Sequence, residues 1–187
     1  MELVSLIDDV LEALVTIDAS RVPFKAFQPG VGPYGEPQLL KLVAQHLNRL
    51  PRYGGQVVTR RFPDLLIPGL WEVEFKIARP FGDNGEEAEN WSVNLLHPYP
   101  GNVSSIGDCL RLLELGGIER RVVAVIGYEH APAKISLDPL IESFEAIASQ
   151  VVRISLSPRV ERRRDGLVHP IHQAVRIFAW EVLDRAA

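Results

Sequence analysis

The sequence contains little cysteine and no long uninterrupted apolar segment. Its one cysteine, Cys109, has no partner for an intramolecular disulfide and no second thiol to complete a metal-ligand spacing. No apolar run reaches the roughly 18 residues that a membrane-spanning helix needs. The N-terminal residues also lack the basic start and unbroken apolar stretch of a signal peptide, because Glu2, Asp8 and Asp9 interrupt them. We therefore expect a cytoplasmic protein that does not contact a membrane.

Neither sign of charge is in large excess. Twenty Lys and Arg residues stand against 24 Asp and Glu residues, which gives a formal net charge of -4. A protein with this balance is not drawn to a polyanion by its bulk charge, so any contact with nucleic acid would need local basic patches. Hydrophobic residues make up 47% of the 187 residues, enough to build a buried core. Length and composition predict a single domain over residues 1–187.

Several segments show apolar residues at helical spacing. In the first of them Leu3, Ile7, Val10 and Leu14 recur every three or four residues, which is typical of an amphipathic helix. Capping residues, proline at a first helical position and glycine after the last turn mark the limits of the later helices. The helices are predicted over residues 1–17, from about 36 to 50, from about 102 to 115, from about 138 to 148 and from about 169 to 185.

Two regions have the composition of β-strands. Residues 56–78 are rich in valine, phenylalanine, isoleucine and tryptophan, and Pro68 and Gly69 interrupt them, which predicts an antiparallel hairpin. An unalternating apolar run within residues 121–128 predicts a central strand covered on both faces. This strand, the helix after it and a strand over residues 151–156 would form a βαβ unit. The expected fold is therefore α/β, with a mixed central sheet and helices on both faces.

The most specific chemical signal lies in residues 62–76. This segment contains Asp64 before a turn, and Glu74 and Lys76 after it. Because side chains alternate along a strand, Glu74 and Lys76 share one face. A three-residue loop over residues 68–70 would place Asp64 directly across from Glu74 on that face, whereas a two-residue loop would separate them.

A pair formed by Asp64 and Glu74 would suit a hard metal ion. Two neighbouring carboxylates repel each other, and a divalent cation is the usual way to keep both ionised. The hairpin offers oxygen ligands and no cysteine or histidine, so the expected ion is Mg²⁺, or Mn²⁺, rather than zinc. Lys76 could then orient or deprotonate a water molecule, and its charge could stabilise a developing oxyanion.

This arrangement resembles the PD-(D/E)XK phosphodiesterase superfamily, whose restriction endonuclease-like fold occurs in many restriction endonucleases and DNA-repair nucleases. The resemblance implies that the Asp and Glu are metal ligands and that the Lys is the active-site lysine. It also implies a mixed sheet carrying the site on its hairpin. The residues that carry the resemblance are Pro63-Asp64 and Glu74-Phe75-Lys76.

The resemblance extends over about residues 36–156, with the N-terminal and C-terminal helices outside this nuclease-like core. Families of this type often add an acidic residue from the helix before the hairpin. Glu36 is in the expected place, and Glu12 is a second option. The implied function is that of a Mg²⁺-dependent endonuclease, a hydrolase acting on the phosphodiester bonds of DNA. Cutting both strands of a duplex often uses two copies related by a two-fold axis, so a homodimer would fit this function.

Basic residues outside the hairpin strands could contact phosphate groups. Arg60 and Arg61 lie beside the hairpin, and Arg162, Arg163 and Arg164 form a cluster in a predicted loop. A solvated loop that binds nothing explains the second cluster equally well.

Two histidines near the C-terminus offer a weaker signal. His169 and His172 are three residues apart at the start of the last predicted helix, and with Glu181 they could suggest a metal site. Because helical spacing alone makes such pairs common, capping or surface roles are the favoured interpretation.

Three alternatives to a nuclease remain open from the sequence. Glu72, Glu74 and Lys76 could form the solvated face of an ordinary half-buried strand. The chain could instead be a non-catalytic binding or regulatory module on the same fold. It could also hydrolyse small phosphorylated substrates, which would require no long basic surface.

Overall fold

The structure is a computed structural model that describes residues 1–99, 101 and 103–183. Its strands are β1 (Val58–Thr59), β2 (Leu65–Ile67), β3 (Trp71–Ala78), β4 (Arg120–Glu129), β5 (Ser155–Leu156), β6 (Val160–Asp165) and β7 (Ala174–Leu183). Its helices are α1 (Leu3–Ala19), α2 (Glu36–Leu47), α3 (Val93–Leu96), α4 (Ser105–Leu113) and α5 (Asp138–Ala146), with a 3-10 turn η1 (Pro51–Tyr53) and a π-helical turn η2 (Ile147–Val151).

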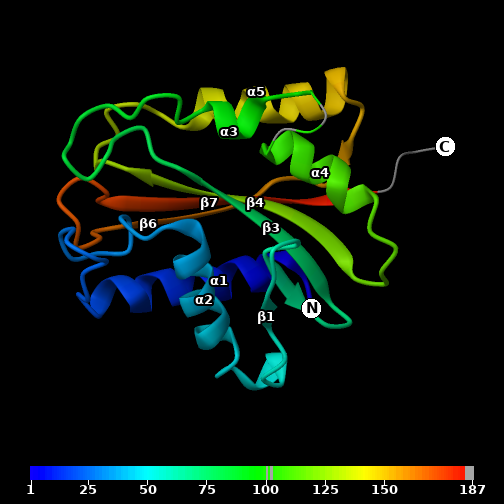
Figure 1. Ribbon diagram of the computed structural model, residues 1–187, viewed down its shortest axis with the longest axis horizontal. Helices are drawn as coiled ribbons and strands as arrows, with labels where there is room; N and C mark the ends of the chain where they lie inside the picture. Colours follow the sequence, from blue (N-terminus) through cyan, green and yellow to red (C-terminus); the bar gives the residue numbers. More distant parts are fainter. Residues whose placement is uncertain (100, 102, 184–187) are drawn as a thin grey trace.

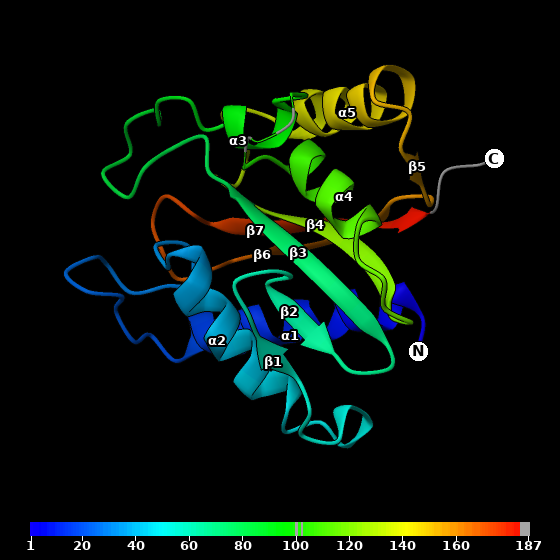
Figure 2. The same cartoon turned by 45° about the vertical axis from the view of Figure 1, so that its right-hand side comes forward.

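A mixed sheet with the order β1-β2-β3-β4-β7-β5 forms the centre of the described chain, and β6 also pairs with β7. The neighbours β3 and β4 are parallel, and α3 and α4 lie in the connection between them. The other strand pairs are antiparallel. α1 and α2 cover one face of the sheet, and α3, α4 and α5 cover the other (Figures 1 and 2). Within the described residues, no helix has the length and apolar character needed to cross a bilayer.

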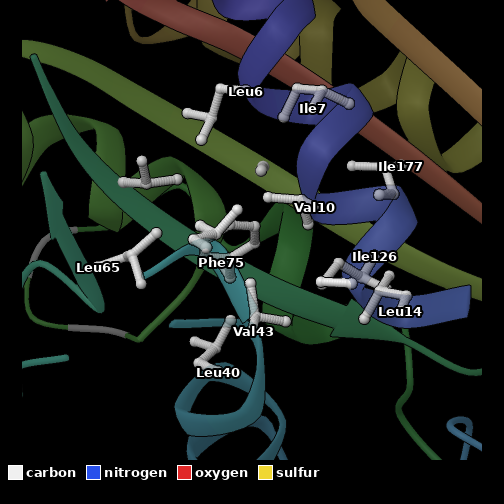
Figure 3. Packing of buried hydrophobic residues seen from close by; sticks show 14 of the residues in the cluster. Leu6, Ile7, Val10, Leu14, Leu40, Val43, Leu65, Phe75, Ile126 and Ile177 are labelled. Atoms are coloured by element: carbon white, nitrogen blue, oxygen red, sulfur yellow. The ribbon is translucent and has the colours of Figure 1, made fainter. Parts of the chain in front are cut away.

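The core on the α1 and α2 side is built from alternate residues of the central strands. Phe75 of β3 and Ile126 of β4 are fully buried there against Val10 of α1 and Val43 of α2 (Figure 3). The intervening residues of these strands point to the opposite face, as the alternation of side chains along a strand requires. The sheet therefore separates two apolar layers.

The core on the other face joins the sheet to α4 and α5. Val123 and Val125 of β4 lie there with Phe144 of α5, whose ring centroid is 4.9 Å from that of Trp180 in β7. β4 is thus covered on both sides, which confirms the interpretation of its unalternating apolar sequence. The α/β class, the mixed sheet and the placement of helices on both faces are also confirmed.

The helix predicted over residues 169–185 is wrong. Residues 174–183 form β7, which pairs with β4 on one side and with β6 on the other. The last two residues of the predicted helix, 184 and 185, lie outside the described residues. Residue 102, where another helix was predicted to begin, also lies outside them. Val175 and Ile177 pack into one core, while Phe178 and Trp180 pack into the other. A strand buried on both faces is apolar at almost every position, so it also satisfies a helical pattern of apolar residues.

Two neighbouring predictions change with β7. The basic loop that contains Arg162 to Arg164 is instead strand β6, whose pairing with β7 no local sequence pattern indicated. β5 is limited to residues 155–156 and pairs with β7, so β7 separates it from β4 and the predicted βαβ unit does not form as expected. The adjacent parallel strands are β3 and β4.

Replacing Phe75 with alanine tests the core on the α1 and α2 side. Because the ring is fully buried, Phe75→Ala is expected to lower the free energy of unfolding by about 3 to 5 kcal/mol. Phe27→Ala is the matched control, since Phe27 is 40% exposed, and it should cost less than about 1 kcal/mol. Urea denaturation followed by circular dichroism measures both, and equal losses would contradict the assigned packing.

Candidate active site

The hairpin has the three-residue loop that the site requires. Ile67 lies opposite Trp71, so residues 68–70 form the loop. Extending this register by one residue before the start of β2 places Asp64 opposite Glu74. The predicted pairing is therefore present in the structure.

Hydrogen bonds lock Asp64 and Glu74 together. The backbone N–H of Asp64 donates to Glu74 Oε2 at 2.9 Å, and the backbone N–H of Phe75 donates to Asp64 Oδ2 at 2.9 Å. Each carboxylate thus accepts from the backbone of the facing segment. This arrangement holds the two acidic side chains beside each other at the residue just before β2 begins.

Glu72, Glu74 and Lys76 are only 8%, 4% and 7% exposed. Their interpretation as the solvated face of a half-buried strand is therefore wrong. Glu74 and Lys76 line a cleft, whereas Glu72 is not among its lining residues. Buried ionisable groups need partners, and Lys76 has a close one.

Lys76 forms an ion pair with a residue that the sequence did not reveal. Its Nζ lies 2.7 Å from Oδ2 of Asp108 in the first turn of α4, and 3.8 Å from Oε1 of Glu74. Nζ also donates to the carbonyl oxygen of Phe75 at 3.1 Å. Asp108 is fully buried. Contacts from both α4 and β3 therefore fix the ammonium group of Lys76 in place.

The start of α4 positions Asp108. Ser104 caps the helix, since its Oγ accepts from the backbone N–H of Gly107 at 3.0 Å and donates to the carbonyl oxygen of His97 at 2.7 Å. The sequence did contain a signal, because Asp108 stands next to Cys109 in a helix that must bury one side against the sheet. The sequence alone does not show which side of this helix packs against the sheet. Asp108 therefore could not be distinguished from an acidic first-turn residue that faces solvent.

Glu36 joins the same cleft from the N-terminal turn of α2, where it is the first helical residue and Pro37 is the second. Burial raises the pKa of Glu36 to about 7, while Lys76 lowers it and Asp64 raises it. Glu36, the acidic residue expected from the helix before the hairpin, thus lines the cleft. Glu12, the second option, is exposed on α1 and is not among the lining residues.

Acidic side chains gather closely in the cleft and raise one another's pKa values. Burial and repulsion from Asp64 and Asp108 together raise the pKa of Glu74 to about 8, against the effect of Lys76. Burial also raises the pKa of Asp64, although the hydrogen bond from Phe75 N–H lowers it. A divalent cation would relieve this repulsion and let the carboxylates remain ionised together. The donor set, all oxygen, suits Mg²⁺ or Mn²⁺.

The cleft has a volume of about 1410 Å³ and combines an acidic base with basic residues along its edge. Arg111 of α4 lies over the ring of Phe62, 3.7 Å from its centroid, and pairs with Asp108 at 3.2 Å. The charged lining residues are Glu36, Lys41, Arg60, Arg61, Asp64, Glu74, Lys76, Arg111 and Glu114.

The second basic cluster does not line this cleft. Arg162 pairs with Asp8 of α1, and Arg163 pairs with Asp165 at 2.7 Å and with Glu129 at 3.1 Å. Arg164 follows them on β6 and is exposed. Arg60 and Arg61 therefore share a surface with the acidic residues, and Arg162 to Arg164 belong to a different one.

His169 has a capping role at a turn rather than at a helix. Nδ1 of His169 accepts from the backbone N–H groups of Ile171 and His172, both at 3.2 Å. Glu181, which the sequence grouped with these histidines, instead pairs with Arg120.

Comparisons with protein-family models, curated proteins and solved structures found no match to this chain. The geometry and chemistry of the cleft are therefore the basis for assigning a function.

The raised pKa values predict how stability depends on pH in metal-free protein. Glu74 and Glu36 hold protons more tightly in the folded chain than at the ordinary value of 4.5, so unfolding releases protons and stability falls as pH rises from about 4.5 to about 8. Glu74→Gln should remove part of this fall and stabilise the protein at pH 8 by on the order of a few kcal/mol.

Urea denaturation between pH 5 and pH 9 in the presence of a chelator measures the effect. Glu142→Gln, at an exposed position on α5, is the control and should leave the pH dependence unchanged. If Glu74→Gln followed the same curve as the unaltered protein, the protonation of Glu74 in the folded state would be disproved.

Proposed function

We propose that this protein is a Mg²⁺-dependent nuclease that hydrolyses DNA phosphodiester bonds and has a restriction endonuclease-like core. The observation that carries the proposal is the meeting of Asp64, Glu74 and Lys76 in one cleft, with basic residues along its edge. Acidic oxygens beside a fixed ammonium suit hydrolysis of a phosphodiester, because the reaction develops negative charge on the phosphate.

Asp64 and Glu74 are the proposed metal ligands, and Glu36 is the helper from α2. Each has an oxygen-only donor group and lines the cleft. A bound Mg²⁺, or Mn²⁺, would supply Lewis acidity toward the phosphate. The hydrogen bonds between Asp64, Glu74 and Phe75 preset the two carboxylates, so little reorganisation is needed when an ion binds.

Lys76 acts as a fixed positive charge. Burial lowers the pKa of Lys76, but Asp108, Glu36 and Glu74 together raise it by more, so the group stays an ammonium. An ammonium donates hydrogen bonds and cannot accept a proton, which favours orienting the attacking water and stabilising the oxyanion over deprotonating the water. Asp108 holds this charge in position from α4.

A polymeric substrate fits the edge of the cleft better than a small phosphate ester does. Lys41, Arg60 and Arg61 are exposed and line the cleft together with the carboxylates. In the part of the chain that the structure describes, neither Lys41 nor Arg61 takes part in an ion pair. Unpaired cations of this kind remain available to successive phosphates of a nucleic acid backbone.

Cleavage assays on plasmid DNA with Mg²⁺ test the proposal. Asp64→Asn, Glu74→Gln and Lys76→Met should each lower the rate by about 100-fold or more, because each removes a group that acts on the reacting phosphate. Glu142→Gln should cleave like the unaltered protein, and a chelator should abolish cleavage.

Unchanged cleavage by Asp64→Asn would disprove the assigned site. Absence of metal-dependent cleavage of both DNA and RNA would favour the non-catalytic module, and release of phosphate from small esters alone would favour the small-substrate hydrolase. The three outcomes separate the functions that the sequence left open.

Duplex DNA binding in the presence of a chelator tests the edge of the cleft separately. Arg61→Gln and Lys41→Gln should each weaken binding and lower the slope of log K against log salt concentration by about 1. Arg164→Gln, on β6 outside the cleft, is the matched control and should change neither quantity. An equal effect of all three substitutions would contradict a substrate path along the cleft edge.

A further inference from the structure

A second group of ligand-type side chains lies outside the cleft. Asp83 comes from the segment after β3, and His169 and His172 come from the connection between β6 and β7. Each offers one ligand atom, and these three atoms lie within 4.8 Å of one another. Neither histidine is exposed, at 0% and 1%, and Asp83 is partly exposed.

The imidazole of His172 is already arranged as a metal ligand. Its Nε2 lies 3.0 Å from the carbonyl oxygen of Phe81, so a hydrogen on Nε2 is donated there and the lone pair remains on Nδ1. That Nδ1 is buried without a hydrogen-bond partner. A ring nitrogen held by a backbone carbonyl, with the other nitrogen available, is the usual outer arrangement around a metal-bound histidine.

His169 completes the pair. The two imidazole rings are stacked, with centroids 4.7 Å apart and an interplanar angle of 20°, and His169 Nε2 is also buried without a partner. Its Nδ1 accepts two backbone hydrogen bonds of 3.2 Å, so coordination through Nε2 would move the ring hydrogen to Nδ1 and give up those long bonds.

Glycines pack closely against the two rings. A Cβ on Gly30 would lie 2.7 Å from His169 Cβ, and a Cβ on Gly32 would lie 2.3 Å from His172 Nδ1. The segment before α2 therefore fits against the histidines only because it lacks side chains at these positions. In both views the connections before α2, after β3 and before β7 lie at the same end of the sheet (Figures 1 and 2).

We propose that Asp83, His169 and His172 form a second metal site, for a transition metal ion of the zinc class. Two imidazoles and a carboxylate select such an ion over Mg²⁺, which prefers oxygen ligands alone. The donor atoms, up to 4.8 Å apart, would each move inward by less than about 1 Å to reach the bond length of about 2.1 Å that zinc makes with nitrogen and oxygen. The partly exposed side of Asp83 leaves a fourth position for water.

An ion at this site would stabilise both sides of the cleft. The segment that contains Asp83 follows Lys76 along the chain, and the glycine segment leads directly into Glu36. Tying both to the turn before β7 would fix the chain on either side of the proposed catalytic groups. The role is therefore structural, and it does not depend on the nuclease proposal.

Titration with Co²⁺ followed by visible absorption tests the second site. All measurements use a chain that carries Asp64→Asn and Glu74→Gln, so that the cleft contributes no carboxylate pair. One equivalent of Co²⁺ should bind with the absorption of a nitrogen-ligated ion, Zn²⁺ should displace it, and excess Mg²⁺ should not. His172→Ala and Asp83→Asn should weaken binding by about tenfold or more.

Glu87→Gln is the matched control, because it removes an acidic group from the same connection and should leave the Kd unchanged. Asp83→Asn alters a partly exposed side chain, so it keeps the test decisive if a histidine variant fails to fold, as judged by circular dichroism. No Co²⁺ absorption, or equal Kd values in Asp83→Asn and Glu87→Gln, would show that the three side chains form only a hydrogen-bonded cluster and would overturn the proposal.

Discussion

The site depends on one edge of β3, where carboxylates rather than another strand accept hydrogen bonds from the backbone N–H groups. β2 pairs with β3 only as far as Val73, so the N–H groups of the remaining residues on that edge have no strand partner. Asp64 accepts the N–H of Phe75, and a hydrogen bond from the backbone of Ile77 lowers the pKa of Glu36. The need to satisfy buried backbone donors therefore brings acidic groups to the place where Glu74 and Lys76 emerge. The carboxylate of Asp64 therefore both accepts a backbone hydrogen bond and contributes to the candidate site.

The sequence predicted those parts of the fold that local patterns determine. α1, α2 and α5 carry one apolar side each, and the hairpin is bounded by its own turn residues, so each could be read within a window of about 10 to 20 residues. The segment of β7 was predicted as a helix because burial on both faces removes the alternation that marks a strand. The segment of β6 was predicted as a loop for a different reason, since its three consecutive arginines form a strand only when β7 provides hydrogen bonds.

The same division applies to the candidate site. Asp64, Glu74 and Lys76 lie on one hairpin, and alternation with a three-residue loop was enough to bring them together in advance. Asp108 reaches Lys76 from a helix more than 30 residues later in the sequence, and Asp83 approaches His169 across a still longer separation. Such encounters depend on how α4 and the connections pack on the sheet, which no local spacing specifies.

The parallel register of β3 and β4 has a consequence for the order of events during folding. The hairpin can form from contacts close in sequence, but a parallel neighbour requires that the whole connection through α4 be closed first, which costs loop entropy before it gains contacts. Asp108 travels on that connection. Lys76 can therefore acquire its closest counter-charge only when the slow, long-range step is complete. A half-folded chain holds Lys76 with the carboxylates of the hairpin but without Asp108.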